Sequence, residues 1–155
     1  VEQVAGRAGR GHFEGRVLVQ TYMHDAMAIL AAAHYDRKRF LADELPKRKM
    51  LGYPPYTRLA NILVWGAEEG AVRAEAEALA KRVQEQIDDI VGDGWQSLGA
   101  APCAIDKLRG QHRWHILIKA PAGADISKLA EPVIRKRRAN KKVNVAVDVD
   151  PYSLL

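Results

Sequence analysis

Two consecutive prolines impose the strongest constraint on how this chain can fold. The segment Leu51-Gly52-Tyr53-Pro54-Pro55-Tyr56 stops any helix before it, because proline lacks a backbone N–H and pushes the preceding residue towards extended conformations. With its two tyrosines, the segment predicts a stiff, extended aromatic connector. We therefore expect a domain boundary here.

Four strands and two helices are predicted after this connector. Residues 68–91 predict the clearest helix, because apolar residues recur at spacings of three and four. Residues 143–149 predict the clearest strand, because valines occupy every second position. The other expected elements are strands at 59–65, 95–98 and 114–119 and a helix at 126–134 that Pro132 should kink or split. The order β-α-β-β-α-β predicts an α+β domain of the ferredoxin-like type, an antiparallel sheet with both helices on one face.

The chain before the connector is expected to be mostly helical. Residues 24–50 predict two helices, with Asp36 as a cap for the second and Pro46 as an interruption. Arg16–Gln20 is a β-branched run that predicts a buried strand. Because the chain begins at Val1 and its first residues already read as helix, we expect it to be the C-terminal piece of something longer.

Composition and charge narrow the function classes. Apolar residues make up 48% of the 155, enough for a core, and the net charge of +5 permits nucleic-acid binding without establishing it. Cys103 is the only cysteine, which excludes an internal disulfide and a cysteine-rich zinc site. A lone cysteine without a signal peptide suits the cytoplasm. Since no apolar run approaches the roughly 18 residues of a membrane helix, we expect no membrane partner.

The segment Gln3-Val4-Ala5-Gly6-Arg7-Ala8-Gly9-Arg10 carries chemistry that suits a polyphosphate. Arg7 and Arg10 stand about one helical turn apart, so both guanidinium groups can point the same way. Guanidinium is always charged and grips phosphate oxygens bidentately. Gly6 keeps the backbone slim where another surface must come close. The alternative is a basic loop, or an anion site without catalytic use.

Two basic clusters are candidate DNA contacts. The first is a turn with Lys107, Arg109, Arg113 and Trp114, in which the cations would neutralise phosphates and the indole could stack on a base. The alternative for Trp114 is a core residue at the start of its strand. The second cluster lies where a helix is expected to end and comprises Arg135, Lys136, Arg137 and Arg138. Its alternative is a solvated surface.

Other chemistry is less supported. Asp148 and Asp150 alternate on a strand, where carboxylates face solvent more often than they bind a metal, and we predict no metal site. No nucleophile with a base and no pair of acids shares one element. There is no Gly-x-x-x-x-Gly-Lys-Ser/Thr phosphate loop, so this chain by itself is not expected to hydrolyse ATP.

Several segments together resemble a known family. Gln3–Arg10 resembles motif VI of superfamily 2 helicases. It is followed, in order, by Gly15–Thr21, Gly52-Tyr53-Pro54-Pro55-Tyr56, Leu98-Gly99-Ala100-Ala101-Pro102, the basic turn 107–114 and Val147-Asp148-Val149-Asp150-Pro151. This series is similar to the C-terminal part of the PriA family of bacterial primosomal replication-restart helicases, over nearly the whole chain. One departure is Ala100, where the family often has proline.

The resemblance implies an organisation in three parts. Residues 1–22 would be the C-terminal end of a RecA-like helicase lobe, residues 23–52 a helical connector, and residues 53–155 the family's C-terminal domain.

The resemblance also implies an activity and partners. The full-length protein would be an ATP-dependent 3′-to-5′ DNA helicase that recognises stalled forks and restarts replication by primosome assembly. Arg7 and Arg10 would be catalytic, and with Gln3 and Gly6 they would contact the phosphates of ATP bound with Mg²⁺. Zinc is expected only upstream of this piece. Partners would be forked and single-stranded DNA, single-stranded-DNA-binding protein and primosome loading proteins. The alternative is a non-catalytic interaction module that docks these protein partners.

Overall fold

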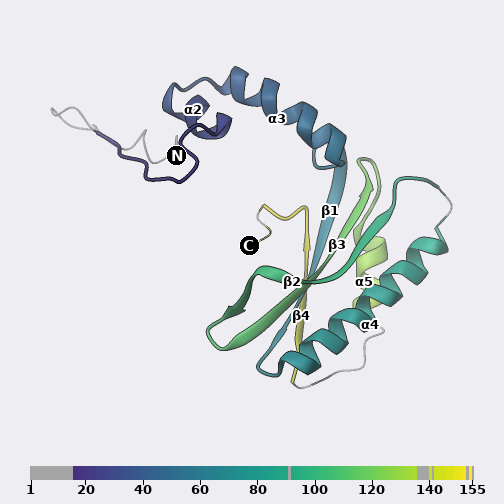
Figure 1. The fold of residues 1–155 in the computed structure, drawn as a ribbon. Helices are drawn as coiled ribbons and strands as arrows, with labels where there is room; N and C mark the ends of the chain where they lie inside the picture. The colour runs from purple at the N-terminus through teal and green to yellow at the C-terminus, as the bar shows by residue number, and fades with distance from the viewer. Residues whose placement is uncertain (1–15, 91, 136–139, 141, 153, 155) are drawn as a thin grey trace, which may run out of the picture. The chain divides into compact units, whose positions relative to one another are not determined.

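The computed structural model describes residues 16–90, 92–135, 140, 142–152 and 154 (Figure 1). The chain divides into two compact units, Val1–Leu51 and Gly52–Leu155. The three-part division expected from the resemblance stays a prediction, and most of its first part lies outside the described residues.

The first unit contains the two predicted helices, α2 (Met27–Ala33) and α3 (Arg37–Leu51). The predicted cap of α3 is confirmed, since the backbone N–H of Arg39 donates to Asp36 Oδ1 at 2.9 Å. The expected interruption at Pro46 is wrong, because α3 continues through this residue.

Two ion pairs each join a residue before Pro46 to a residue after it, and they help to explain why the helix continues. Lys47 Nζ lies 2.6 Å from Asp43 Oδ2, and Arg48 Nε lies 2.8 Å from Glu44 Oε1. Each joins residues four apart, and such pairs stabilise a helix by roughly 0.2–0.5 kcal/mol. They therefore offset part of the cost of the proline.

The strand expected at Arg16–Gln20 is wrong. These residues have no regular secondary structure and are exposed, with Leu18 96% accessible. A strand needs a neighbouring backbone to satisfy its N–H and C=O groups, and no strand in the described part of the chain pairs with this segment. Its β-branched composition is therefore not enough to form one.

The second unit has the predicted β-α-β-β-α-β order. Its elements are β1 (Thr57–Gly66), α4 (Glu69–Asp88), β2 (Gln96–Leu108), β3 (Gln111–Pro121), α5 (Ser127–Arg135) and β4 (Asn144–Val149). The four strands lie in the order β2-β3-β1-β4, and every neighbouring pair is antiparallel. The ferredoxin-like prediction is thus confirmed for this unit.

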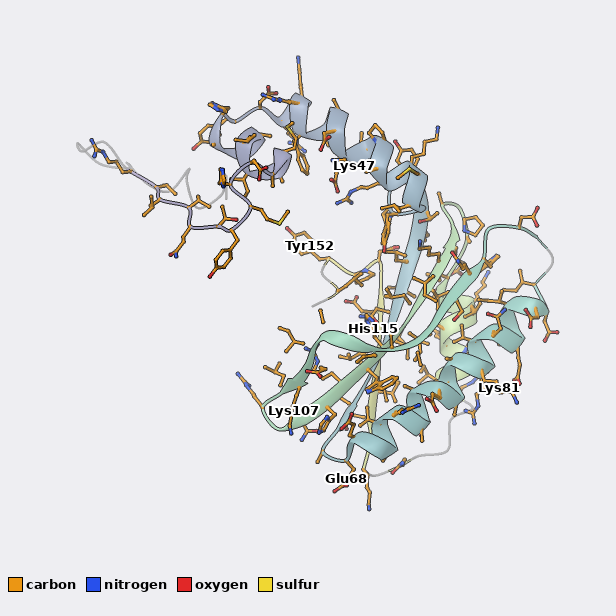
Figure 2. All side chains as sticks on the ribbon, in the orientation of Figure 1. Lys47, Glu68, Lys81, Lys107, His115 and Tyr152 are labelled. Carbon is orange, nitrogen blue, oxygen red and sulfur yellow. The ribbon has the colours of Figure 1, made fainter. Side chains whose placement is uncertain are left out.

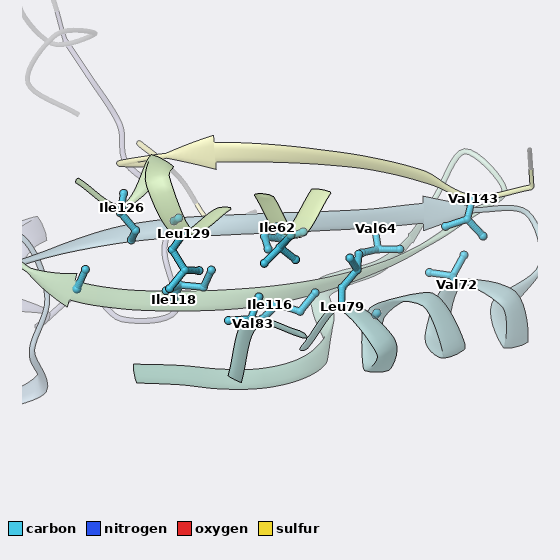
Figure 3. Close-up of a cluster of buried hydrophobic side chains, with 14 residues drawn as sticks. Ile62, Val64, Val72, Leu79, Val83, Ile116, Ile118, Ile126, Leu129 and Val143 are labelled. Atoms are coloured by element: carbon cyan, nitrogen blue, oxygen red, sulfur yellow. The ribbon is translucent and has the colours of Figure 1, made fainter. Parts of the chain in front are cut away.

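The core lies between the sheet and its two helices. Ile62 and Val64 of β1 and Ile116 and Ile118 of β3 are fully buried against α4 and α5 (Figure 3). Helix α4 contributes Val72, Ala76, Leu79 and Val83, which are the positions of its predicted apolar stripe. Both helices therefore cover the same face of the sheet, as the sequence predicts.

The sequence predicts that Pro132 kinks or splits helix α5, and the split is wrong, because α5 is continuous through Pro132. It runs from Ser127 to Arg135 and buries Leu129, Ala130 and Val133 against the core. A proline inside a helix costs about 3 kcal/mol or more, while each large apolar side chain that is buried contributes roughly 1.5–3 kcal/mol. The packing of this face can therefore outweigh the lost hydrogen bond.

An arginine joins three segments at one end of the sheet. Arg58 Nη2 donates to Asp150 Oδ2 at 2.5 Å, and Arg58 Nη1 donates to the carbonyl oxygen of Ala124 at 2.9 Å. The backbone N–H of Asp150 donates to the carbonyl of Leu59 at 2.8 Å. The start of β1, the loop before α5 and the end of β4 are thereby held together.

Candidate nucleic-acid interface

The second face of the sheet lies opposite the core, and no helix in the described part of this unit covers it. We call this surface the open face. Because side chains alternate along a strand, it is formed by every second residue of the two central strands: Leu59, Asn61, Leu63 and Trp65 of β1, and Arg113, His115, Leu117 and Lys119 of β3.

The connector folds against one end of the open face. Lys119 Nζ lies 4.5 Å from the centre of the Tyr53 ring, within the range of a cation–π contact. Thr57 Oγ1 donates to the carbonyl oxygen of Gly52 at 2.9 Å, which fixes the start of the connector. Leu59, on the same end of the face, is only 4% exposed.

The other end of the open face is more accessible. Leu63, Trp65, Arg113 and His115 are all half-buried. In register, Leu63 lies opposite His115, and Trp65 lies opposite Arg113. An aromatic ring, an imidazole and a guanidinium therefore lie together on adjacent strands.

Two buried polar atoms on this face lack a hydrogen-bond partner among the described residues, Asn61 Oδ1 and His115 Nδ1. Asn61 is itself only 9% exposed. Burial lowers the pKa of His115, and the charge of Arg113 lowers it further. His115 is therefore neutral at pH 7, with one ring nitrogen as a donor and the other as an acceptor.

The thiol of Cys103 lies beside the same arginine. Burial raises its pKa, an effect that the charge of Arg113 partly opposes. At neutral pH the side chain is therefore a thiol and not a thiolate, and it behaves as a small apolar group.

The first predicted DNA-contact cluster forms the tip and one strand of the β2–β3 hairpin. Arg109 and Gly110 occupy the turn with φ of 51° and 77°. Two successive positive φ values are typical of a type I′ turn, whose twist matches that of the flanking strands. Lys107 and Arg109 are exposed at this tip, while Arg113 is half-buried and its Nη1 donates to the carbonyl of Ile105 at 3.4 Å.

Trp114 is separated from these cations by the alternation of β3. Its ring packs against the hydrophobic core on the helix side of the sheet, and the guanidinium carbon of Arg73 lies 5.9 Å from the ring centre. This location matches the alternative interpretation of Trp114, a core residue at the start of its strand. A DNA contact by this indole stays a prediction.

The second predicted cluster is only partly described. Arg135 is exposed at the last position of α5, beside a surface pocket of about 390 Å³ that is also lined by Ile134 and Val147. Lys136, Arg137 and Arg138 lie outside the described residues, and so do Gln3, Gly6, Arg7 and Arg10 of the proposed phosphate site.

Neither a metal cluster nor a membrane-spanning helix is found among the described residues. In the part of the chain that the structure describes, His, Cys, Asp and Glu side chains form no group of three or more that could hold a metal ion. Within the same residues, every helix is too short or too polar to cross a membrane.

The strand extents and residue alternation that define the open face could be read from the sequence only in part. The sequence predicts the strands around Leu63 and His115, and of the residues on their non-core side it assigns only Arg113 to a site, the first DNA-contact cluster. The available signal was Trp65, a large aromatic residue on the same side of its strand as polar Asn61. Strand β2 was also underestimated. It extends over 13 residues, but from Ala104 to its end at Leu108 every residue is exposed and alternation is lost.

Comparisons with known proteins agree over nearly the whole chain. The family model described as "Primosomal protein N C-terminal domain" matches residues 49–152. The "Replication restart protein PriA" of Synechocystis sp. (strain ATCC 27184 / PCC 6803 / Kazusa) is 35% identical over 153 residues, covering 98% of this chain and 18% of that protein.

Two other relatives carry the same name. That of Treponema pallidum (strain Nichols) is 33% identical over 99% of this chain and 23% of its own length. That of Haemophilus influenzae (strain ATCC 51907 / DSM 11121 / KW20 / Rd) is 33% identical over 98% of this chain and 20% of its own length. The chain thus spans about a fifth of the length of these curated relatives.

Proposed function

Because the chain belongs to the primosomal protein N C-terminal domain family, we propose that it is the C-terminal part of an ATP-dependent 3′-to-5′ DNA helicase that restarts stalled replication forks. The observation that carries this proposal is the extent of the match. The relatives align with 98% to 99% of the chain, so the likeness includes the segment before the family domain as well as the domain itself.

In this proposal, the first ten residues complete an ATP site on the longer protein. Arg7 and Arg10 stabilise the charge that develops on the terminal phosphates during hydrolysis. Gln3 and Gly6 lie at the same phosphates. The phosphate loop and the Mg²⁺-binding carboxylate come from other parts of the longer protein, since this chain has no phosphate-loop motif.

A substitution in the longer protein tests this ATP site. We expect Arg10→Ala to abolish ATP hydrolysis while DNA binding stays largely intact, because the arginine acts on the nucleotide. Arg16→Ala, a nearby exposed arginine outside the motif, is the matched control and should retain turnover. Normal turnover in Arg10→Ala would exclude the motif VI role.

The second unit contributes DNA contacts in this proposal. Cations at the hairpin tip and at the end of α5 neutralise phosphates, and forked or single-stranded DNA is the ligand. Each neutralised phosphate releases counterions, so affinity should fall steeply with salt. Lys107 lies on the hairpin, whereas Lys81 lies on α4 and serves as a matched control (Figure 2).

Titration of the chain with fluorescent single-stranded and forked DNA at two salt concentrations tests this role. We expect Lys107→Ala with Arg109→Ala to weaken binding and to reduce the salt slope by roughly one for each phosphate that the variant no longer neutralises. Lys81→Ala should leave both the affinity and the slope unchanged. Absent binding at low salt would contradict a DNA-binding role for this chain.

A second candidate function is a docking module for single-stranded-DNA-binding protein or primosome loading proteins. The observation that favours it is the exposure of apolar side chains on the hairpin, where Ile105 is 44% and Leu108 is 48% accessible. Such residues suit the apolar centre of a protein interface. Partner binding that is insensitive to salt and is abolished in Leu108→Asp, together with absent DNA binding, would favour this function.

A further inference from the structure

We propose that the open face of the sheet binds a short segment of single-stranded DNA, with one base stacked on Trp65 and its neighbour against His115. This site is separate from the cations of the hairpin tip. The choice of DNA rests on the function proposed above.

The first argument is the arrangement of rings on the central strands. Trp65 lies opposite Arg113, and His115 lies opposite Leu63, so the indole and the imidazole are diagonal neighbours on one face. Diagonal positions in an antiparallel pair are roughly 7–8 Å apart, within reach of aromatic side chains. Flat rings on the two central strands of a four-stranded sheet are a general way to stack two or three unpaired bases.

The second argument is the distribution of charge. Arg113 is half-buried beside Trp65, and strand β3 continues from it to the cationic tip at Arg109. Asp148, on the outer strand β4 opposite Asn61, places a carboxylate on the other side of the face. A phosphate backbone is attracted to the β3 side and repelled from the β4 side, which gives the bound strand a defined path.

The third argument is the pair of buried polar atoms without partners among the described residues. Asn61 Oδ1 is an acceptor and needs a donor, which a phosphate cannot supply but the amino group of a base can. Neutral His115 offers a further hydrogen bond through Nδ1. An apolar protein surface would leave both atoms unsatisfied, at a cost in free energy. The polar edge of a base would satisfy them once the neighbouring side chains move aside, since both atoms are buried in the unbound chain.

The test compares single-stranded and duplex DNA of equal length, titrated with the full chain and its variants. We expect Trp65→Ala to weaken single-strand binding about tenfold and duplex binding much less, because stacking a base on an aromatic ring changes affinity by roughly 5- to 150-fold. Trp65→Phe should retain most of the affinity, since its ring can still stack. Tyr152→Ala removes an aromatic side chain that is 106% exposed and should change neither affinity.

A measurement on the unaltered chain protects the test from variants that fold poorly. In ¹⁵N-labelled protein, single-stranded DNA should shift the amide signals of residues 61–65 and 113–117. Unchanged affinity in Trp65→Ala, with those signals unmoved and salt-sensitive binding preserved, would overturn the open-face site and leave the hairpin role intact. That result would indicate a protein partner for the open face. Absence of any DNA binding would instead overturn both.

Discussion

Arg58 is a single side chain that holds three segments together at one end of the sheet. Its guanidinium group reaches both carboxylate oxygens of Asp150 and a carbonyl in the loop before α5. The hydrogen bond from Arg58 lowers the pKa of Asp150, and the same bond raises the pKa of Arg58. The two directions agree, so the pair favours the charged form of both groups.

The prediction at this scale concerns acid stability. We expect Asp150→Asn to lower the thermal midpoint at pH 7, since the substitution removes the ion pair. Asparagine tolerates the positive φ of 53° at this position, so the backbone is little disturbed. Because the pKa of Asp150 is depressed on folding, its contribution is complete above the unfolded value of about 3.9 and is lost as the pH falls through the folded value.

Thermal unfolding of both proteins from pH 7 to pH 2 checks this prediction. The difference in midpoint should be largest near pH 7 and should shrink below about pH 4. A difference that is constant down to pH 2 would mean that the carboxylate charge contributes nothing.

At the scale of elements, the close approach of β1 to the segment before β4 depends on a glycine. A Cβ atom at Gly66 would lie 2.5 Å from the carbonyl oxygen of Lys142 and 3.2 Å from Val72 Cγ2. The first contact is with backbone, which cannot move aside as a side chain can. The last residue of β1 must therefore lack a side chain.

This close approach predicts opposite effects for two glycine substitutions. We expect Gly66→Ala to destabilise the protein by about 1–3 kcal/mol, the usual cost of overpacking. Gly70→Ala, in the first turn of α4, meets no atom within 4 Å and should stabilise it by up to about 1 kcal/mol. Chemical denaturation of both variants measures the two changes, and equal effects would contradict the steric explanation.

Elements with a strong apolar period were predictable from the sequence, and those set by tertiary context were not. Helix α4 and strand β4 follow their predicted patterns because each packs one side against the core. The extent of β2 escaped prediction because its end is exposed on both sides. The expected split at Pro132 is wrong because local propensity does not report how much apolar surface a helix buries. The open face was not predicted as a binding site for a related reason. Alternation separates the core side of a strand from its other side, but it does not indicate which ligand the other side binds.

At the scale of the whole chain, the stabilising core belongs to one unit. All fourteen residues of the buried apolar cluster lie between Ala60 and Val143. Among the described residues of the first unit, Ala31 alone is buried, and α3 buries none. Since burial of apolar surface is the main favourable term in folding, the second unit should not need the first in order to fold.

The last prediction is that residues 52–155 fold without residues 1–51. We expect this fragment to unfold in one cooperative transition, with a midpoint within about 4 °C of that of the full chain, because 1 kcal/mol shifts the midpoint of a domain of about 100 residues by roughly 4–8 °C. Calorimetry of the fragment and the full chain under one set of conditions measures this. A fall of more than about 8 °C, or a broad transition, would show that the first unit stabilises the second. A midpoint within about 4 °C would make the second unit an autonomous domain, in which the hairpin cations and the open face can be tested without the first unit.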